Sequence, residues 1–135
     1  MKLKKITAAC TLACATLFGA AAPAQAQISG DVIRIGIITD MSSLYADIDG
    51  PGGVEAIKMA IADAGGAVNG KKIEVLFADH QNKADIAAAK AREWFDTQGL
   101  DMLIGGTNSG TAMAMAKVAA EKKKPDEPLT MVRTY

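Results

Sequence analysis

Three short apolar runs alternate with three longer stretches that carry apolar residues at helical spacing. The runs are Val32–Ile38, Lys72–Asp79 and Asp101–Ile104, and the stretches are Val54–Ala64, Asn82–Gln98 and Thr111–Lys123. Short β-branched runs are typical of strands, and longer stretches with a period of 3.6 are typical of helices. The resulting β-α-β-α-β-α order predicts an α/β fold, a doubly wound parallel sheet with helices on both faces.

The first run is almost continuously apolar, with valine or isoleucine at five of its positions between Val32 and Ile38. Such a run suits a central strand covered on both faces. In the second run Ile73, Val75 and Phe77 alternate with Glu74, and Leu76 gives partial cover on the other side. With the usual order 2-1-3, the first strand lies between the other two.

Each predicted helix has one apolar face and a chain-breaking signal beside it. Gly50–Gly53 leads into the first helix, Gly65-Gly66 ends it, and Asn69-Gly70 marks a tight turn. We expect Asn82 to cap the second helix, Trp94 to lie in the core, and Gly99 to end that helix. The expected buried faces are Val54, Ile57, Ile61 and Ala64; Ala84, Ala87, Ala88, Ala91, Trp94 and Phe95; and Ala112, Met113, Ala116, Ala119 and Ala120.

Two loops open into one crevice in this arrangement. Ligands of doubly wound folds lie beyond the carboxyl ends of the strands, where the strand order reverses. The loop with Ser42, Ser43 and Tyr45 follows the first strand, and the turn Gly105–Thr111 follows the neighbouring third strand. Their convergence favours a ligand site between the first and third strands.

The turn after the third strand has the composition of an anion site at a helix N-terminus. Gly105, Gly106 and Gly110 let the backbone approach a bound group. Backbone N–H groups of the first helical turn favour a carboxylate or phosphate. The side chains that offer hydrogen bonds there are Thr107, Asn108, Ser109 and Thr111. The alternative is that Ser109 or Asn108 caps the helix without a ligand.

Other chemistries find less support in the residues. Thr111, not lysine, follows Gly110, so a phosphate-binding loop lacks its point charge. No glycine fingerprint follows the first strand, which argues against a dinucleotide. His80 is the one histidine, too few for a metal site, and no nucleophile elbow accompanies Ser42, Ser43 or Ser109. We expect no enzyme activity, cofactor or metal.

The first 26 residues have the anatomy of a secretory signal peptide. Lys2, Lys4 and Lys5 precede the uncharged apolar run Ile6–Ala22, and Ala24-Gln25-Ala26 is a small-x-small cleavage site. Both cysteines fall inside this segment, so the 135 residues less these 26 leave 109 without cysteine. Losing three lysines leaves 12 basic residues against 15 acidic ones. Without a basic stripe, nucleic-acid binding is disfavoured.

The order of several motifs resembles one known family. They are Ile35–Asp40, Gly50–Ala56, Val68–Val75, Ala78–Asn82 and Ile104–Ala112. Together with the signal peptide, they resemble the N-terminal part of a periplasmic solute-binding protein of the branched-chain amino acid (Leu/Ile/Val-binding) family of ABC transporters. The resemblance covers Asp31 to about Lys124.

This resemblance implies one lobe of a type I periplasmic clamshell that presents a small ligand to a membrane permease. In the family a ligand carboxylate commonly meets a serine hydroxyl and backbone amides at the third-helix N-terminus, here Ser109, Gly110 and Thr111. The loop after the first strand lines the cleft, here Ser42, Ser43 and Tyr45. That loop lacks the glycine-proline form usual among the amino acid binders, so aromatic acids or other small carboxylates are alternatives.

The chain departs from the family after Lys124. Residues 125–135 carry two prolines and two acids where an apolar fourth strand is expected. The expected organisation is therefore a signal peptide (1–26), a partial N-terminal lobe (27–124) and an aberrant, disordered tail (125–135) from a truncated or frameshifted reading frame. The competing interpretations are a standalone small domain, either a sensory ligand-binding module or an enzyme remnant, and a non-functional fragment.

Overall fold

The computed structural model describes residues 28, 30–124 and 126–128. The elements in chain order are β1 (Val32–Thr39), α1 (Ala46–Asp49), α2 (Pro51–Asp63), β2 (Ala67–Val68), β3 (Lys71–Asp79), α3 (Ala84–Thr97), β4 (Met102–Gly105), α4 (Ser109–Lys122) and β5 (Asp126–Pro128). The predicted signal peptide lies outside the described residues.

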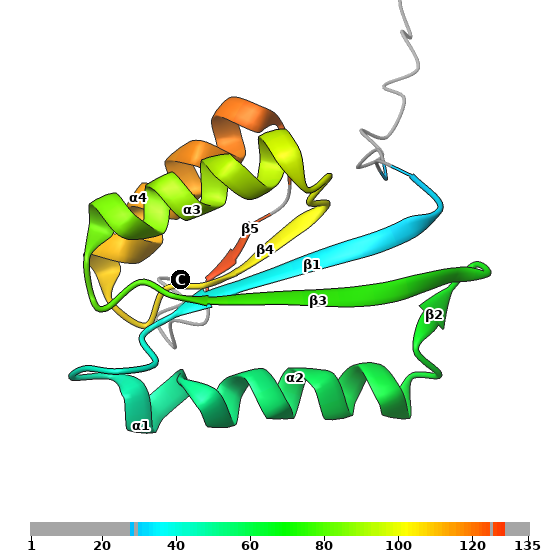
Figure 1. The fold of residues 1–135 in the computed structure, drawn as a ribbon, viewed down its shortest axis with the longest axis horizontal. Helices are drawn as coiled ribbons and strands as arrows, with labels where there is room; N and C mark the ends of the chain where they lie inside the picture. The colour runs from blue at the N-terminus through cyan, green and yellow to red at the C-terminus, as the bar shows by residue number, and fades with distance from the viewer. Residues whose placement is uncertain (1–27, 29, 125, 129–135) are drawn as a thin grey trace, which may run out of the picture.

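The described strands form one sheet in the order β2-β3-β1-β4-β5. Strand β1 pairs in parallel with β3 on one side and with β4 on the other, whereas β2 joins β3 as a short antiparallel hairpin. Helices α3 and α4 cover one face of the sheet, and α1 and α2 lie on the opposite face (Figure 1). The predicted doubly wound sheet with the first strand at its centre is therefore confirmed.

The main core lies between the sheet and helices α3 and α4. It consists of Ile38, Ala87, Ala91, Trp94, Leu100, Leu103, Met115 and Val118. The predicted core position of Trp94 is confirmed, with 7 % of the residue exposed. Gly36 makes this packing possible, because a Cβ there would lie 2.8 Å from both the Trp94 ring and the Leu100 side chain.

Helix α2 begins earlier than the sequence predicts. Pro51 takes the first helical position, where its missing N–H costs no hydrogen bond, and Gly52 and Gly53 continue the helix. Of the expected apolar face, Val54 is buried, Ile57 and Ile61 are half-buried and Ala64 is exposed. This helix therefore covers its side of the sheet only in part.

Two expectations about helix ends and faces were wrong. Asn82 does not cap α3; it has φ of +56° and lies one residue before the N-cap Lys83, because the turn after β3 uses left-handed residues first. Helix α4 begins at Ser109, and it buries Thr111, Met115, Val118 and Ala119. Met113 instead is 74 % exposed, since the larger Met115 and Val118 side chains select the buried face over the alanine stripe.

Beyond Lys124 the structure adds a short strand within the stretch that the sequence predicts to be an aberrant tail. Residues 126–128 pair in parallel with Leu103, Ile104 and Gly105 as strand β5. Edge strands tolerate proline because a missing N–H on the outer side breaks no ladder bond. The remainder of the expected tail, residues 125 and 129–135, lies outside the described residues.

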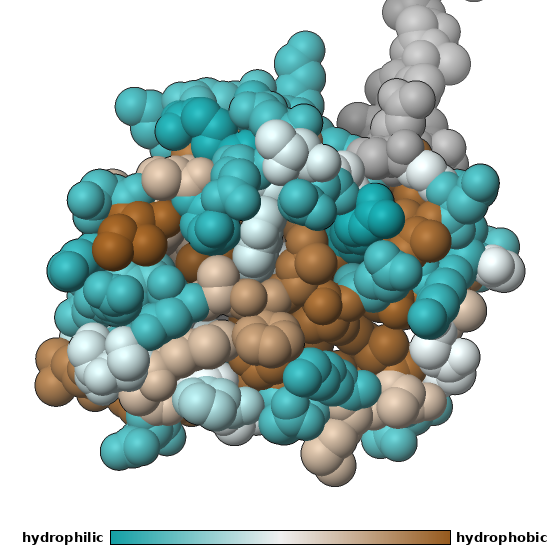
Figure 2. Space-filling view, viewed as in Figure 1, coloured by the Kyte–Doolittle hydropathy of each residue, from teal (hydrophilic) through white to brown (hydrophobic). Residues whose placement is uncertain are grey.

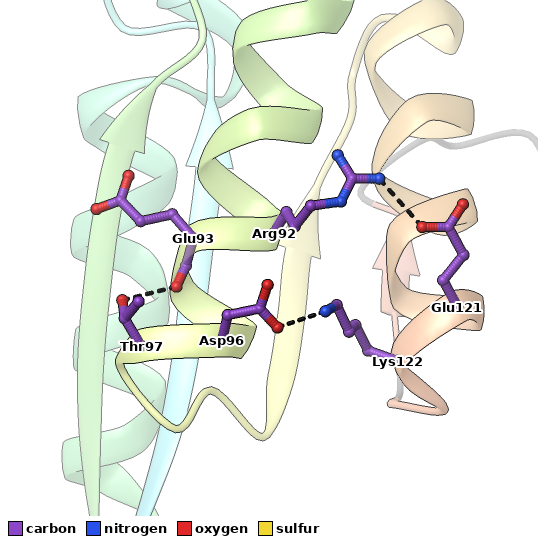
Figure 3. A network of polar contacts seen from close by, with 6 residues as sticks. All are labelled: Arg92, Glu93, Asp96, Thr97, Glu121 and Lys122. Atoms are coloured by element: carbon purple, nitrogen blue, oxygen red, sulfur yellow. Dashed lines mark hydrogen bonds and ion pairs between the residues drawn. The ribbon is translucent and has the colours of Figure 1, made fainter.

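Surface ion pairs join helices α3 and α4 (Figure 3). Arg92 of α3 lies 3.0 Å from the Glu121 carboxylate of α4, and Lys122 of α4 pairs with Asp96 of α3. Their side chains are about one-third to one-half exposed, so each pair contributes about 0 to 1 kcal/mol. The buried side chains of α3 and α4, not these pairs, hold the helices in place.

The opposite face carries an exposed apolar patch between β3 and α2 (Figure 2). An open pocket of about 260 Å³ on this side of the sheet is lined by Met41, Pro51, Val54, Glu55, Lys58 and Phe77. Phe77 is 53 % exposed, and the Lys58 ammonium lies 4.7 Å from the centre of its ring. Across the described residues, no helix has the length and apolar character needed to cross a membrane.

Candidate functional site

The carboxyl ends of β1, β3 and β4 meet at one edge of the sheet, where α3 and α4 begin (Figure 1). The loop with Ser42, Ser43 and Tyr45 leaves β1 at this edge, and the turn Gly105–Asn108 leaves β4 beside it. The predicted convergence of these two segments follows from the observed pairing of β1 with β4. A reversal of strand order at this edge is the usual place for a ligand.

Asp40 organises the loop that follows β1. The carboxylate is 1 % exposed and accepts hydrogen bonds from the Ser43 and Tyr45 amides, each at 2.9 Å, and from the Ser43 hydroxyl at 2.6 Å. The Ser42 amide adds a longer bond at 3.4 Å. Burial alone would raise the pKa of this carboxyl, but the hydrogen bonds outweigh it and lower the pKa below 3.8. Asp40 is therefore ionised at neutral pH.

Asp79, at the end of β3, holds the same loop from the other side. Its carboxylate accepts from the Met41 amide at 3.0 Å, the Ser42 hydroxyl at 2.5 Å and the Gln81 amide at 2.7 Å. Burial and the nearby Asp40 charge raise the pKa of Asp79, yet these hydrogen bonds leave it lower than 3.8. The two carboxylates together fix the path of the chain between Asp40 and Tyr45.

Two glycines shape the turn after β4. Gly105 has φ of +153°, and a Cβ there would lie 2.0 Å from the Ile38 carbonyl oxygen. Gly106 has φ of +99°, and its Cβ would lie 2.5 Å from the Ala112 side chain. A larger residue at either position would push β4 away from β1 or α4 away from the turn.

Asn108 caps helix α4, as the sequence predicts for one of its two candidate capping residues. Its side-chain oxygen accepts from the Gly110 amide at 2.7 Å and from the Thr111 amide at 3.3 Å. Two of the three amides expected to meet a ligand carboxylate are thus already bonded within the protein. Ser109 is exposed, and neither its amide nor its hydroxyl has a partner among the described residues.

Thr107 links the turn after β4 to α1. Its hydroxyl donates to Asp49, 58 residues earlier in the chain. Asp49 is 8 % exposed, and its second carboxylate oxygen has no hydrogen-bond partner among the described residues. No sequence signal marks Asp49, because acidic residues in a polar loop carry no periodic pattern.

His80 is buried behind the same edge, with 1 % of the residue exposed. Its Nδ1 accepts from the Asn82 amide at 2.9 Å, so the ring holds its proton on Nε2 when neutral. Burial lowers the pKa of His80 below 6.5, although the charges of Asp40, Asp49 and Asp79 act in the opposite direction. The histidine is therefore uncharged at neutral pH.

Some of the predicted site hydroxyls already donate a hydrogen bond within the protein, and others do not. Ser42 and Ser43 donate to Asp79 and Asp40, Thr107 donates to Asp49, and Thr111 donates to the Asn108 carbonyl at 2.8 Å. The Ser109 and Tyr45 hydroxyls make no hydrogen bond among the described residues. Ser109 and Tyr45 can therefore donate to a ligand, whereas the bonded hydroxyls can only accept.

Neither a hydrolase nor a metal site is assembled at this edge in the described part of the chain. The Ser42 and Ser43 hydroxyls contact carboxylates, and His80 contacts the Asn82 amide. No group of three or more His, Cys, Asp or Glu side chains is placed to hold a metal ion within residues 30–124. In the described residues, this edge presents the exposed hydroxyls of Ser42 and Ser43 as acceptors and that of Ser109 as a donor.

Comparisons with known proteins agree with this architecture. A 1.80 Å crystal structure of a periplasmic binding protein from Burkholderia mallei is 70 % identical, with a TM-score of 0.72, over 74 % of this chain and 27 % of that one. A branched chain amino acid ABC transporter periplasmic ligand-binding protein from Burkholderia xenovorans LB400 is 45 % identical, with a TM-score of 0.67. That match covers 70 % of this chain and 25 % of the other.

A third structure is a solute-binding protein of an ABC transporter from Rhodopseudomonas palustris BisB5 in complex with 3,4-dihydroxybenzoic acid. It is 29 % identical, with a TM-score of 0.70, over 75 % of this chain and 28 % of that one. The chain therefore spans about a quarter of the length of these structures. A search of curated proteins gave no match.

The family model described as periplasmic binding protein matches residues 32–130, which is most of the chain. The matched region includes the whole described sheet from β1 to β5 and both loops of the crevice. The resemblance to branched-chain amino acid binding proteins of ABC transporters holds in sequence and in fold. On these grounds the chain belongs to the periplasmic binding protein family.

Proposed function

We propose that this chain supplies the N-terminal ligand-binding segment of an extracytoplasmic solute-binding protein of an ABC-type uptake system. Its ligand is a branched-chain amino acid or a related small carboxylate, including aromatic acids. The Burkholderia xenovorans relative supports the amino acid, and the Rhodopseudomonas palustris relative supports the aromatic acid. Residues 1–26 act as a cleaved signal peptide that directs the protein to the periplasm, where it delivers its ligand to a membrane permease.

One observation carries the ligand proposal. The exposed Ser109, with an amide and a hydroxyl that are unbonded among the described residues, starts α4 beyond the carboxyl end of β4, the strand that pairs with β1. A helix N-terminus favours a negative charge, and Ser109 adds two donors for a carboxylate. Asn108 caps the Gly110 and Thr111 amides and holds the helix in place, so the carboxylate bonds chiefly to Ser109.

Nuclear magnetic resonance on the full chain tests this proposal. Titration with leucine and with benzoate, up to tens of millimolar, should shift the amide signals of residues 42–45 and 107–111. One lobe leaves the ligand partly hydrated, so we expect dissociation constants no tighter than about millimolar, or about −4 kcal/mol. Shifts confined to the pocket beside Phe77, or no shifts with any small carboxylate, would contradict the proposed site.

A further inference from the structure

Strand β3 leaves most of its outer side without a neighbouring strand. It has nine residues, and β2 pairs with only the first two of them (Figure 1). The His80 amide donates to a carbonyl of β1, whereas the Ile73 amide donates to the Gly66 carbonyl on the outer side. Because successive residues alternate between the two sides, Val75 and Phe77 also direct their backbone N–H and C=O groups outward. Neither residue has a backbone partner there among the described residues.

The side chains beside this open edge are apolar. Phe77 is exposed on the face that α2 covers in part, where the Lys58 ammonium lies 4.7 Å from the centre of its ring (Figure 2). Val75 lies on the same face of β3, because side chains alternate along a strand with a period of two. An apolar edge strand with unpaired backbone groups is a template for pairing with another strand.

The edge is complementary to a second copy of itself. A two-fold axis at Leu76 would pair two β3 strands in antiparallel fashion and place Val75 of one copy opposite Phe77 of the other. Since both residues direct their backbone groups outward, each such pair can exchange both N–H···O=C hydrogen bonds. It also joins an aromatic to a β-branched side chain, which is a favourable cross-strand pair. The same register sets Glu74 opposite Ala78, so no like charges face each other.

The charges beside the edge favour a second copy over a charged partner. The Lys58 ammonium lies 2.8 Å from the Glu55 carboxylate, so the two side chains leave the face beside Phe77 without net charge. A symmetric contact brings this face against its own copy, and a net charge of either sign would there repel itself. A strongly acidic or basic partner would find no opposite charge to meet.

The other edge of the described sheet does not offer a similar contact. It is formed by β5, whose three residues are Asp126, Glu127 and Pro128. Proline donates no backbone hydrogen bond, and adjacent acidic residues disfavour pairing between identical edges. A symmetric contact through β3 uses the same edge of both copies and is therefore closed. Pairing should stop at two copies.

We infer that this chain forms a two-fold symmetric dimer through the outer edge of β3, which joins the two described sheets into one. The inference goes beyond the proposed function and does not depend on it, because no residue assigned to the ligand takes part in the contact. Edge pairing buries less surface than a standard interface, so we expect a dissociation constant on the order of 100 micromolar.

Sedimentation equilibrium of the full chain, at concentrations below and above this value, tests the inference. Phe77→Lys places a charge at the edge and should raise the dissociation constant at least about tenfold. Val75→Pro removes an N–H that the ladder with β1 does not use, so it should weaken the dimer by about tenfold more than Val75→Ala, which keeps the N–H. Met113→Lys, at an exposed methionine of α4, is the matched control and should leave the dimer unchanged.

A disulfide cross-link tests the register. In a Cys10→Ser, Cys14→Ser background, Leu76→Cys should give a disulfide-linked dimer on oxidation. Residues on the two-fold axis form a pair without mutual hydrogen bonds, whose Cα atoms lie about 4.5 Å apart, within reach of a disulfide. Met113→Cys in the same background should give no such dimer.

Three results would overturn the inference. They are a monomer at every concentration, an open series of larger assemblies, and a dimer that neither Phe77→Lys nor Val75→Pro weakens, which would place the contact on another part of the chain. The amide spectrum of each variant establishes that it folds, and Phe77→Lys alone decides if the proline variant does not. Failure of Leu76→Cys to cross-link, with a dimer present, would likewise contradict pairing through this edge.

Discussion

Replacing Asp40 by asparagine should destabilise the loop after β1 and the fold with it. The substitution keeps one oxygen, which still accepts from the Ser42 and Ser43 amides, and turns the other into an amide nitrogen facing the Tyr45 N–H. The Ser43 hydroxyl can rotate toward solvent, but the Tyr45 amide loses its acceptor. One unsatisfied amide costs about 1 to 3 kcal/mol, and weaker neutral hydrogen bonds add about 1 kcal/mol.

Urea denaturation should therefore show a loss of about 2 to 4 kcal/mol in the free energy of unfolding. The slope of that free energy against urea concentration should be unchanged. Hydrogen exchange of the Ser43 and Tyr45 amides should accelerate as well. Asp47→Asn, an exposed neighbour in α1, is the control and should change stability by less than about 0.5 kcal/mol. A loss below 0.5 kcal/mol for Asp40→Asn, with both amides still protected, would refute the role assigned to this carboxylate.

Stability should fall in two steps as the pH is lowered. Burial lowers the pKa of His80 in the folded chain, so below pH 6.5 the unfolded chain binds a proton that the folded chain does not. The free energy of unfolding therefore declines as the pH falls from 6.5 toward the folded pKa of His80. Asp40 and Asp79 contribute stability above pH 3.8 that is lost as the pH falls through their lowered folded values. His80→Gln should remove the first step alone in urea midpoints measured against pH, and an unchanged first step would refute its assignment. Gly105→Ala should lower the free energy of unfolding by more than about 3 kcal/mol, since the new Cβ would meet the Ile38 carbonyl oxygen. Gly52→Ala within α2 should instead raise it by about 0.5 to 1 kcal/mol. Equal thermal midpoints for these two glycine variants would contradict the packing described for the turn after β4.

Hydrophobic periodicity predicted the elements whose faces differ strongly in polarity. The continuous run of β1 and the alanine, tryptophan and phenylalanine stripe of α3 were sufficient to place both elements in the core. Helix α4 was harder, because its alanines and methionines surround the helix and leave a weak contrast between faces. There the buried face was decided by how Met115 and Val118 pack against the sheet, which is a tertiary effect.

The candidate site was predictable in its location but not in its internal hydrogen bonds. Strand order and the glycine turn placed both loops at one edge, as the pairing of β1 with β4 bears out. The partners of Ser42 and Thr107 lie 37 and 58 residues away in the sequence, on other elements. No local pattern encodes such contacts, so the sequence revealed the hydroxyls without showing which of them still had a proton to donate.

The proposed function depends on binding of the ligand carboxylate by Ser109 at the N-terminus of α4. Its most direct test is calorimetry on a two-lobed hybrid, in which residues 30–124 replace the matching stretch of the 70 % identical Burkholderia mallei protein. Ser109→Ala should weaken the binding of leucine or benzoate to the hybrid by about 1 to 3 kcal/mol, because a charge-assisted hydrogen bond is lost. Thr97→Ala, at the last residue of α3, where the hydroxyl donates to the Glu93 carbonyl (Figure 3), should leave the affinity unchanged. An affinity unaltered by Ser109→Ala would contradict the claim.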